Sequence, residues 1–531
     1  MQLSFIGGAE AVTGSCCLLV DERLRLRCLV DCGAHAERGA GFADGAPRLG
    51  FDARRLDFVV LTHAHRDHSG RLPQLHRAGF RGPVYCTEAT AWLTRLALLD
   101  AAKFSREYDA DDVELIDFQP LDRHPDFVFD RPIRRHGITL TFHRSAHILG
   151  AVAVTLGWRN LVGRQRAIVF SGDVGGNTPA NPFQSLLAGQ AVPGEADYMV
   201  VESTRGAEPA RAPAYKSFEQ RMAAWTDVLA DSDARGGGPV VAPCFAIHRA
   251  QELWFDLDYV LRNSAVGRPD GHGRPRWLAL DSPLAVRMTE VFADLLVSDR
   301  TGERPRYRNP QLADRLGVAS ESAVDDYLAA LWRRVASNRA PGGTLRALRD
   351  ATLSRVVALA GSGMCEGGRI VDFIADQIGN PAATIVLCGY APPDTGAGRL
   401  RRLGAGDWPD EPLPLGRFRI EPASVRARIV DFGDYYSGHG DIDALLRFVF
   451  ETDAERPSPA TVWLNHGDRD MQQALADRVR ERVNAAQPGD RPIERVEPAR
   501  TRQVYELDAA DIERRSLSTA TLLARRRSST R

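Results

Sequence analysis

The segment Thr62-His63-Ala64-His65-Arg66-Asp67-His68-Ser69-Gly70 places four potential metal ligands within six residues. It directly follows residues 57–62, a short run rich in β-branched side chains that predicts a buried strand. A loop at the end of a strand can aim several side chains at one point, because the strand fixes its base. Three imidazoles and one carboxylate form a nitrogen and oxygen donor set that suits Zn²⁺. The segment therefore predicts a metal site in preference to a solvated, histidine-rich loop.

Strand-like and helix-like segments alternate on both sides of this loop. Further strands are predicted at 29–33, 167–171, 198–201, 239–242, 277–280, 356–360 and 384–387, and helices at 209–235 and around 322–336. Such alternation predicts an α/β or layered αββα architecture. A chain of 531 residues is too long for one ordinary core, so we expect two or three domains.

Composition restricts the function only weakly. The formal net charge is -1, and a local basic groove would be enough to hold nucleic acid. The eight cysteines form no C-x-x-C pair, which favours buried, reduced thiols and a reducing compartment. The first residues lack the features of a signal peptide, and no apolar run approaches the 18 or so residues that span a bilayer. We therefore expect a cytoplasmic protein without membrane association.

The histidine-rich segment resembles the signature of the metallo-β-lactamase superfamily. Three further motifs match in the family order: Asp31 in Val-Asp-Cys-Gly, His147 in Ser-Ala-His-Ile-Leu-Gly, and Asp173 in Phe-Ser-Gly-Asp-Val-Gly. The resemblance implies two Zn²⁺ ions, with Mn²⁺ as an alternative, and a bridging role for Asp173. It implies that Asp31 fixes the tautomer of a ligating imidazole. The implied ligands are His63, His65 and His147 for one metal, and Asp67, His68 and one further histidine for the other.

Three later motifs resemble the β-CASP branch of this superfamily. Glu202 lies in Val-Glu-Ser-Thr-Arg-Gly, His439 in Tyr-Ser-Gly-His-Gly-Asp, and His466 in Leu-Asn-His-Gly-Asp. The resemblance makes His466 the remaining metal ligand. It implies a ribonuclease in which a hydroxide activated by two metals attacks the phosphodiester and His439, oriented by Glu202, protonates the leaving oxygen. The catalytic residues implied are Asp31, Asp67, Glu202 and His439.

Substrate phosphates have a second set of candidate contacts. The glycine-rich loop 361–368 could bind phosphate through its backbone N–H groups, although an ordinary turn has the same composition. With the resemblance, the candidates are Ser362, Gly363, Gly367, Gly368, Arg249, Arg399 and Ser437. The chain departs from the family at two positions. His248 stands where glycine is usual, and Arg205 stands where an aromatic residue is common, which puts the fine specificity in doubt.

The resemblance covers about residues 1–470 and predicts the domain order. We expect an αββα metallo-β-lactamase sandwich formed by 1–208 and 415–510, an inserted α/β β-CASP domain at 209–414, and an arginine- and serine-rich tail at 511–531. The expected partner is RNA, in single-stranded form. A DNA nuclease of the same branch, a catalytically inert RNA-binding scaffold and a small-molecule hydrolase are the alternatives, and the last would leave 209–414 unexplained. The sequence is compatible with endonucleolytic cleavage, with 5′-to-3′ exonucleolytic cleavage, or with both. It is likewise compatible with a monomer and with a homodimer.

Overall fold

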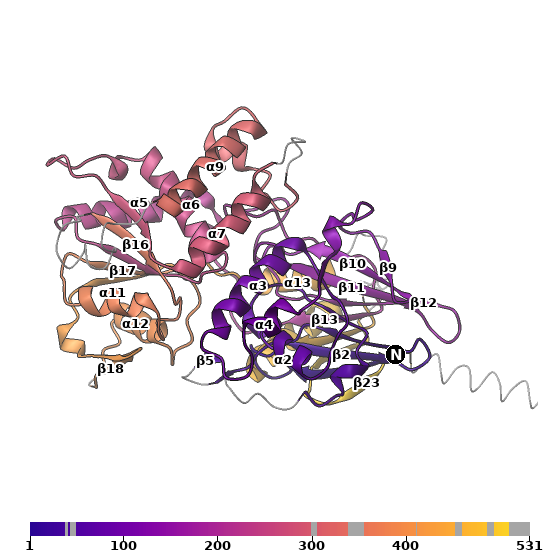
Figure 1. The fold of residues 1–531 in the computed structure, drawn as a ribbon. Helices are drawn as coiled ribbons and strands as arrows, with labels where there is room; N and C mark the ends of the chain where they lie inside the picture. The colour runs from indigo at the N-terminus through magenta and orange to yellow at the C-terminus, as the bar shows by residue number, and fades with distance from the viewer. Residues whose placement is uncertain are drawn as a thin grey trace, which may run out of the picture.

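The computed structural model describes residues 1–37, 41–42, 49–298, 305–337, 355–409, 411–451, 459–485 and 493–508. The predicted tail at 511–531 lies outside these residues. Two lobes are visible, one holding both ends of the described chain and the other holding its middle (Figure 1). None of the helices in the described ranges has the length and apolar character needed to cross a membrane.

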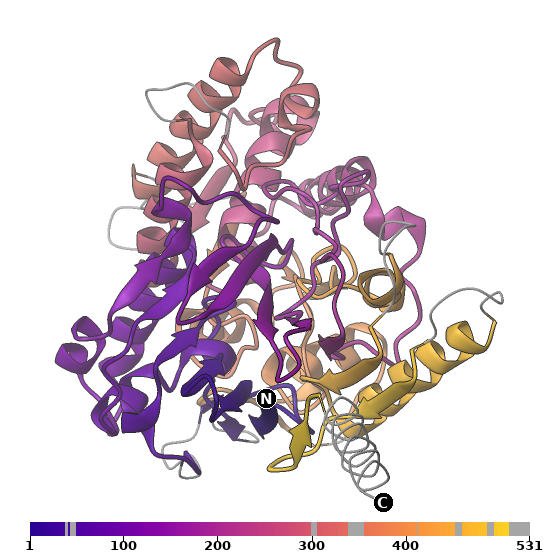
Figure 2. The same cartoon turned by 90° about the vertical axis from the view of Figure 1, so that its right-hand side faces the viewer.

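The first lobe is built on two seven-stranded sheets. The first sheet has the order β23 (Val504–Glu506), β1 (Gln2–Gly7), β2 (Cys16–Asp21), β3 (Leu26–Val30), β6 (Phe58–Val60), β7 (Val84–Cys86) and β8 (Phe118–Pro120). The second has the order β22 (Arg495–Pro498), β21 (Thr461–Asn465), β13 (Tyr198–Glu202), β12 (Gln165–Phe170), β11 (Val152–Arg159), β10 (Ile138–Arg144) and β9 (Ile133–Arg135). The yellow C-terminal strands lie beside the indigo N-terminal ones, because β23 pairs with β1 (Figure 2).

Apolar side chains from both sheets meet in one core between them, which contains Phe5, Val60, Phe142, Phe170 and Trp463. The outer face of the first sheet is covered by α2 (Leu72–Arg77), α3 (Glu88–Ala102) and α4 (Ala110–Glu114). The outer face of the second is covered by α13 (Ile442–Phe450) and α14 (Arg469–Asn484). This is the expected αββα sandwich. All eight cysteines are buried and free, as predicted.

The second lobe is a parallel sheet between two helical layers. Its order is β15 (Trp277–Leu280), β16 (Val356–Ala360), β14 (Val240–Pro243), β17 (Thr384–Leu387) and β20 (Arg428–Asp431). One face packs against α5 (Phe218–Ala234), α6 (Arg249–Asn263), α7 (Pro283–Leu296) and α9 (Glu321–Ser337). The other packs against α11 (Arg369–Gln377) and α12 (Gly396–Gly404). Three of the strands are buried along their whole length, as in sheets covered on both faces.

Smaller elements complete the two lobes. They are α1 (Arg66–Ser69) and the two-stranded β4 (Ala36–Glu37) and β5 (Gly41–Phe42) in the first lobe, and α8 (Leu312–Leu316) with the hairpin β18 (Leu413–Leu415) and β19 (Phe418–Ile420) in the second.

The predicted strands of the second lobe and the helix around 322–336 are confirmed, whereas the helix predicted at 209–235 begins only at Phe218. The sheet has one more strand than the sequence indicates. Val430 of β20 pairs in parallel with Val386 of β17. The strand thus extends the inserted sheet rather than the sandwich, to which the sequence-based prediction assigns residues 415–510. We propose that the insertion begins near residue 209 and ends after Asp431 instead of at 414.

The segment 305–318 joins the two lobes. The hydroxyl of Tyr307 donates to the Asp122 carboxylate. The backbone carbonyl of Tyr307 accepts from the backbone N–H of Ala188 at 2.9 Å. The side-chain amide of Asn309 donates to the carbonyls of Pro182 and Gln184 at 3.0 and 2.8 Å. Tyr307 and Asn309 therefore help to pack the insertion onto the sandwich.

Candidate metal centre

Loops at the ends of strands from both sheets meet at one edge of the sandwich. Asp31 follows β3, residues 63–68 follow β6, Asp173 follows β12, and His466 follows β21. Asp31 and His466 have positive φ angles, 62° and 50°. Such backbone conformations cost of order 1 kcal/mol in residues other than glycine and cluster at functional sites. The local fold thus accepts strain to aim these two side chains inward.

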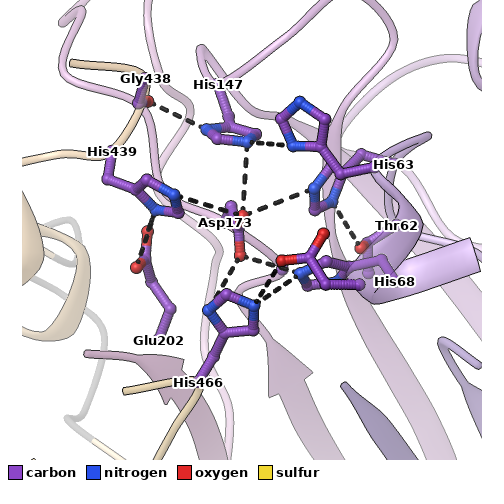
Figure 3. Close-up of polar contacts among 12 residues, drawn as sticks. Thr62, His63, His68, His147, Asp173, Glu202, Gly438, His439 and His466 are labelled. Carbon is purple, nitrogen blue, oxygen red and sulfur yellow. Dashed lines mark hydrogen bonds and ion pairs between the residues drawn. The ribbon is translucent and has the colours of Figure 1, made fainter. Parts of the chain in front are cut away.

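The first group of converging atoms comes from His63, His65, His147 and Asp173, whose donor atoms all lie within 4.8 Å of one another. The Nε2 atom of His147 lies 3.0 Å from Nδ1 of His65. Asp173 Oδ2 lies 3.3 Å from Nε2 of His147 and 3.5 Å from Nε2 of His63 (Figure 3).

The second group comes from Asp67, His68 and His466. The Nε2 atoms of His68 and His466 lie 3.0 Å apart, and Asp67 Oδ2 lies 3.4 Å from Nε2 of His466. The second oxygen of Asp173, Oδ1, lies 3.2 Å from Nε2 of His68. The Asp173 carboxylate therefore faces each group with one oxygen.

Hydrogen bonds on the far side of the rings fix which nitrogen faces the centre. His68 donates from Nδ1 to Asp31 Oδ2 at 2.7 Å, and His147 donates from Nδ1 to the carbonyl of Gly438 at 3.0 Å. Their Nε2 atoms then present lone pairs, each 3.0 Å from another imidazole nitrogen. At that distance the two nitrogens of each pair can share one proton or bind one cation between them.

Two polar atoms of the centre have no hydrogen-bond partner among the described residues: His63 Nε2 and Asp173 Oδ1. Both side chains are 1% exposed, and buried polar atoms are nearly always paired. The unpaired atoms, the facing nitrogens and the mixed nitrogen and carboxylate donors fit a site for two transition-metal ions.

Burial and charge set the protonation of the ligands. Burial lowers the pKa of His63, His65 and His147, to about 4 for His65, which keeps these imidazoles neutral. Burial would raise the pKa of Asp173, but the surrounding histidines hold it well below its usual value. Neutral imidazole and ionised carboxylate are the forms that bind metals.

His439 and Glu202 stand beside the centre as a pair. Nδ1 of His439 lies 3.1 Å from both carboxylate oxygens of Glu202, and its Nε2 lies 3.8 Å from Asp173 Oδ2. Burial lowers the pKa of His439, but the Glu202 and Asp173 carboxylates more than compensate and raise it to about 9. Glu202 is held in turn by the backbone N–H of Val174 at 2.7 Å. The pair thus presents one imidazole N–H to the centre.

The arginines and the serine predicted to contact substrate phosphates are mostly engaged with other groups of the protein. Arg249, 6% exposed, is ion-paired with Glu252 and lies over the ring of Tyr436. Arg399 donates to the carbonyls of Pro414 and Asp394, so its donors are used within the insertion. Ser437 is buried and donates to the carbonyl of His439 at 3.0 Å.

The glycine-rich loop leads into α11. Ser362 hydrogen-bonds through its backbone N–H and its hydroxyl to the carbonyl of Gly367, both at 3.3 Å. Gly368, with φ 72°, is the N-cap of α11 and offers no side-chain cap. In the first turn, the backbone N–H of Ile370 donates to the carbonyl of Gly361 at 3.0 Å, so the loop itself satisfies one of the groups that an anion would need. Gly363 lies against the ring of Phe245.

Sequence reasoning missed three groups that orient the ligands. Thr62 donates to Asp31 Oδ2 at 2.9 Å and lies 3.1 Å from Nδ1 of His63. Thr204 lies 3.2 Å from Nδ1 of His466. The carbonyl of Gly438 holds His147. The two threonines lie within the recognised motifs, and that position is the only signal that the sequence gives of their role. A contact through a backbone carbonyl, such as that of Gly438, cannot be recognised from the side chain.

The two departures from the family pattern have defined surroundings. Arg205, 8% exposed, pairs with Glu208 at 2.5 Å and Asp434 at 3.4 Å, and so ties the first lobe to the loop that leads to His439. His248 is the N-cap of α6 with φ 66° and is 2% exposed. A positive φ angle favours glycine, and this explains why glycine is the usual residue at this position in the family.

Three family models match the chain in succession. They describe the metallo-beta-lactamase superfamily at residues 12–152, the Beta-Casp domain at 250–400, and a Zn-dependent metallo-hydrolase RNA specificity domain at 422–486. Ribonuclease TTHA0252 of Thermus thermophilus is 31% identical over 484 residues, covering 90% of this chain and 95% of that protein. The chain belongs to the β-CASP family of metallo-β-lactamase hydrolases.

Other β-CASP relatives are more distant. Transcription termination factor FttA of Cenarchaeum symbiosum is 28% identical, covering 90% of this chain and 68% of that protein. Cleavage and polyadenylation specificity factor subunit 3-I of Arabidopsis thaliana is 28% identical over 325 residues, which cover 60% of this chain and 43% of that protein. A solved protein of unknown function from Enterococcus faecalis V583 shares the fold, with a TM-score of 0.50, 12% identity, and coverage of 95% of this chain and 99% of that one.

Proposed function

We propose that this β-CASP hydrolase is a zinc-dependent ribonuclease that cleaves single-stranded RNA with two metal ions. The observation that carries the proposal is the arrangement around Asp173. Its two carboxylate oxygens face two separate groups of ligands, and the His439–Glu202 pair stands beside them. His63, His65 and His147 would hold one ion, Asp67, His68 and His466 the other, and Asp173 would bridge them.

The choice of RNA is supported by the relatives. One of them is named a ribonuclease, and the model matched at 422–486 is described as an RNA specificity domain. That segment contains both His439 and His466, so it overlaps the centre itself. A DNA nuclease would need the same centre, whereas an inert scaffold would not need seven buried or half-buried ligands.

Bound metal ions would supply Lewis acidity, making water acidic enough to ionise near neutral pH and offsetting charge on the attacked phosphate. The chain's own groups do the rest. Asp31 fixes the tautomer of His68. Glu202 accepts from Nδ1 of His439, so the opposite nitrogen carries the proton that a departing oxygen requires when the ring is charged.

One assay with three substrates tests the proposal. The substrates are RNA with a label at its 5′ end, RNA with a label at its 3′ end, and DNA of the same sequence. Zinc-loaded protein should shorten both RNAs and leave the DNA much less affected. The pattern of labelled products separates internal cleavage from stepwise 5′-to-3′ degradation. Equal cleavage of RNA and DNA would favour the alternative substrate with the same centre.

A further inference from the structure

The carboxyl edge of the five-stranded sheet faces the metal centre through its loops. The strands are parallel, so the loops after β14, β16 and β20 leave the sheet on the same side. The loop after β20 leads to His439, and the loop after β16 is the glycine-rich segment 361–368. Ligands of open α/β sheets bind outside this edge.

Phe245 is an exposed aromatic residue in the loop after β14. Its side chain is 38% exposed, although its neighbour Cys244 is 1% exposed. A Cβ atom added to Gly363 would lie only 2.8 Å from two carbon atoms of the Phe245 ring. The ring therefore rests on the backbone of the glycine-rich loop, and part of it faces solvent.

A short path connects Phe245 to the metal centre. The carbonyl of Phe245 accepts from the backbone N–H of Ala250 in the first turn of α6, at 3.1 Å. Beside it, a terminal nitrogen of Arg249 lies 4.0 Å from the position that a Cβ of Gly438 would occupy. The carbonyl of Gly438 holds the ring of His147. Phe245 therefore belongs to the loop that leads into α6, and Arg249 of the same helix start lies beside the segment that holds His147.

We propose that Phe245 is a stacking platform for a nucleobase of the RNA, next to the phosphate that is cleaved. This rests on the proposed function. An exposed aromatic ring that rests on a backbone loop is the kind of surface on which single-stranded nucleic acid stacks, because every base has a π-face. Stacking is indifferent to base identity, so Phe245 contributes affinity for an unpaired strand rather than sequence preference.

The competing explanation is that Phe245 only packs on Gly363 and supports the loop. Replacement by leucine separates the two roles, since leucine keeps the apolar contact and removes the π-face. Replacement by tryptophan keeps both. Trp277 is the matched control: it is 40% exposed and is the first residue of β15, so it lies at the amino edge of the same parallel sheet.

The experiment measures kcat/KM for single-stranded oligoribonucleotides that each lack the base at one position near the cleavage site. In the wild-type protein, one position should show a loss of about 5- to 150-fold, the effect of removing one base–aromatic stack. Phe245→Leu should lose about as much on intact RNA, mainly through KM, and should show no further loss at that position. Phe245→Trp should keep the penalty at that position, and Trp277→Ala should behave like the wild type.

Three results would overturn the proposal. The first is an equal abasic penalty in wild type and Phe245→Leu, the second a wild type with no sensitive position, and the third a loss in Phe245→Leu that appears in kcat with unchanged KM. In all three the wild type still cleaves RNA, so the proposed function stands. Failure of the zinc-loaded wild type to cleave any of these RNAs would instead refute the proposed function itself.

Discussion

The Nε2 atoms of His68 and His466 lie 3.0 Å apart, although 398 positions separate the two residues in the chain. The whole inserted lobe lies between them in sequence. β13 and β21 make the meeting possible, because they pair in parallel with Glu202 opposite Asn465. The second group of ligands is therefore complete only when the chain has built the insertion and returned to the sandwich.

Replacing His466 should remove one metal and spare the other. His466→Ala deletes a ligand of the second group, whereas His63, His65 and His147 are untouched. Elemental analysis of the purified proteins should find about two equivalents of zinc in the wild type, as a two-metal site requires, and about one in the variant. His272→Ala, at an exposed histidine, should keep both. An unchanged zinc content in His466→Ala would remove His466 from the ligand set.

Asp31→Asn should weaken metal binding without removing a ligand. Asp31 Oδ2 accepts from Nδ1 of His68 at 2.7 Å, and Oδ1 accepts from the backbone N–H of Thr62 at 2.8 Å. Loss of such an orienting group typically costs 10- to 100-fold in metal affinity. Competition with a zinc chelator should show a loss of about that size. Affinity equal to that of the wild type would mean that Asp31 serves the fold alone.

His439→Ala should keep its metal and lose most of its activity. Its ring contacts Glu202 and approaches Asp173, but it belongs to neither group of converging ligands. Losing a general acid typically costs about 10²–10⁴ in rate. Asp173→Ala should lose both metal and activity, because both groups depend on its carboxylate. Single-turnover cleavage combined with zinc analysis measures the difference, and a wild-type rate in His439→Ala would refute the acid role.

Tyr436→Phe should destabilise the junction between the lobes. The Tyr436 hydroxyl accepts from Nε1 of Trp225 at 2.6 Å and donates to Asp256 at 2.7 Å, all within a buried network that includes Arg221. Leaving buried partners unsatisfied costs about 1–3 kcal/mol. Urea unfolding should show that loss.

Tyr435→Phe provides the control for this measurement, because its side chain is only partly buried. Its free energy of unfolding should stay within about 0.5 kcal/mol of the wild type. Equal stability of Tyr436→Phe and the wild type would show that the hydroxyl network does not hold the loop that leads to His439.

The sequence predicts the centre better than its surroundings. Residues 63–68 combine a strand, a loop and four donors in one short window, and the resemblance supplies Asp31, His147, Asp173 and His466 in order. These residues are recognisable because ligand chemistry restricts their identity. The carbonyl of Gly438 orients His147 in the way that Asp31 orients His68, yet any residue has a carbonyl.

Long-range pairing is the reason for placing the end of the insertion after Asp431 in our proposal. Residues 428–431 have the composition of a strand, but composition does not say which sheet the strand joins. That choice depends on its parallel pairing with β17, and parallel partners are separated by crossover connections. The surroundings of Arg249 were likewise not predictable from local sequence. Its burial against Glu252 and Tyr436 arises from the packing of distant segments and could not be inferred from its own motif.

Metal-dependent cleavage of RNA is the central claim, and one comparison tests it most directly. Wild-type protein and Asp173→Ala, purified in parallel, are stripped of metal, and each is incubated with single-stranded RNA before and after zinc is returned. We predict no cleavage by either stripped protein, restored cleavage by the wild type with zinc, and none by Asp173→Ala. Intact RNA with the zinc- or manganese-loaded wild type, or equal cleavage by both proteins, would contradict the account.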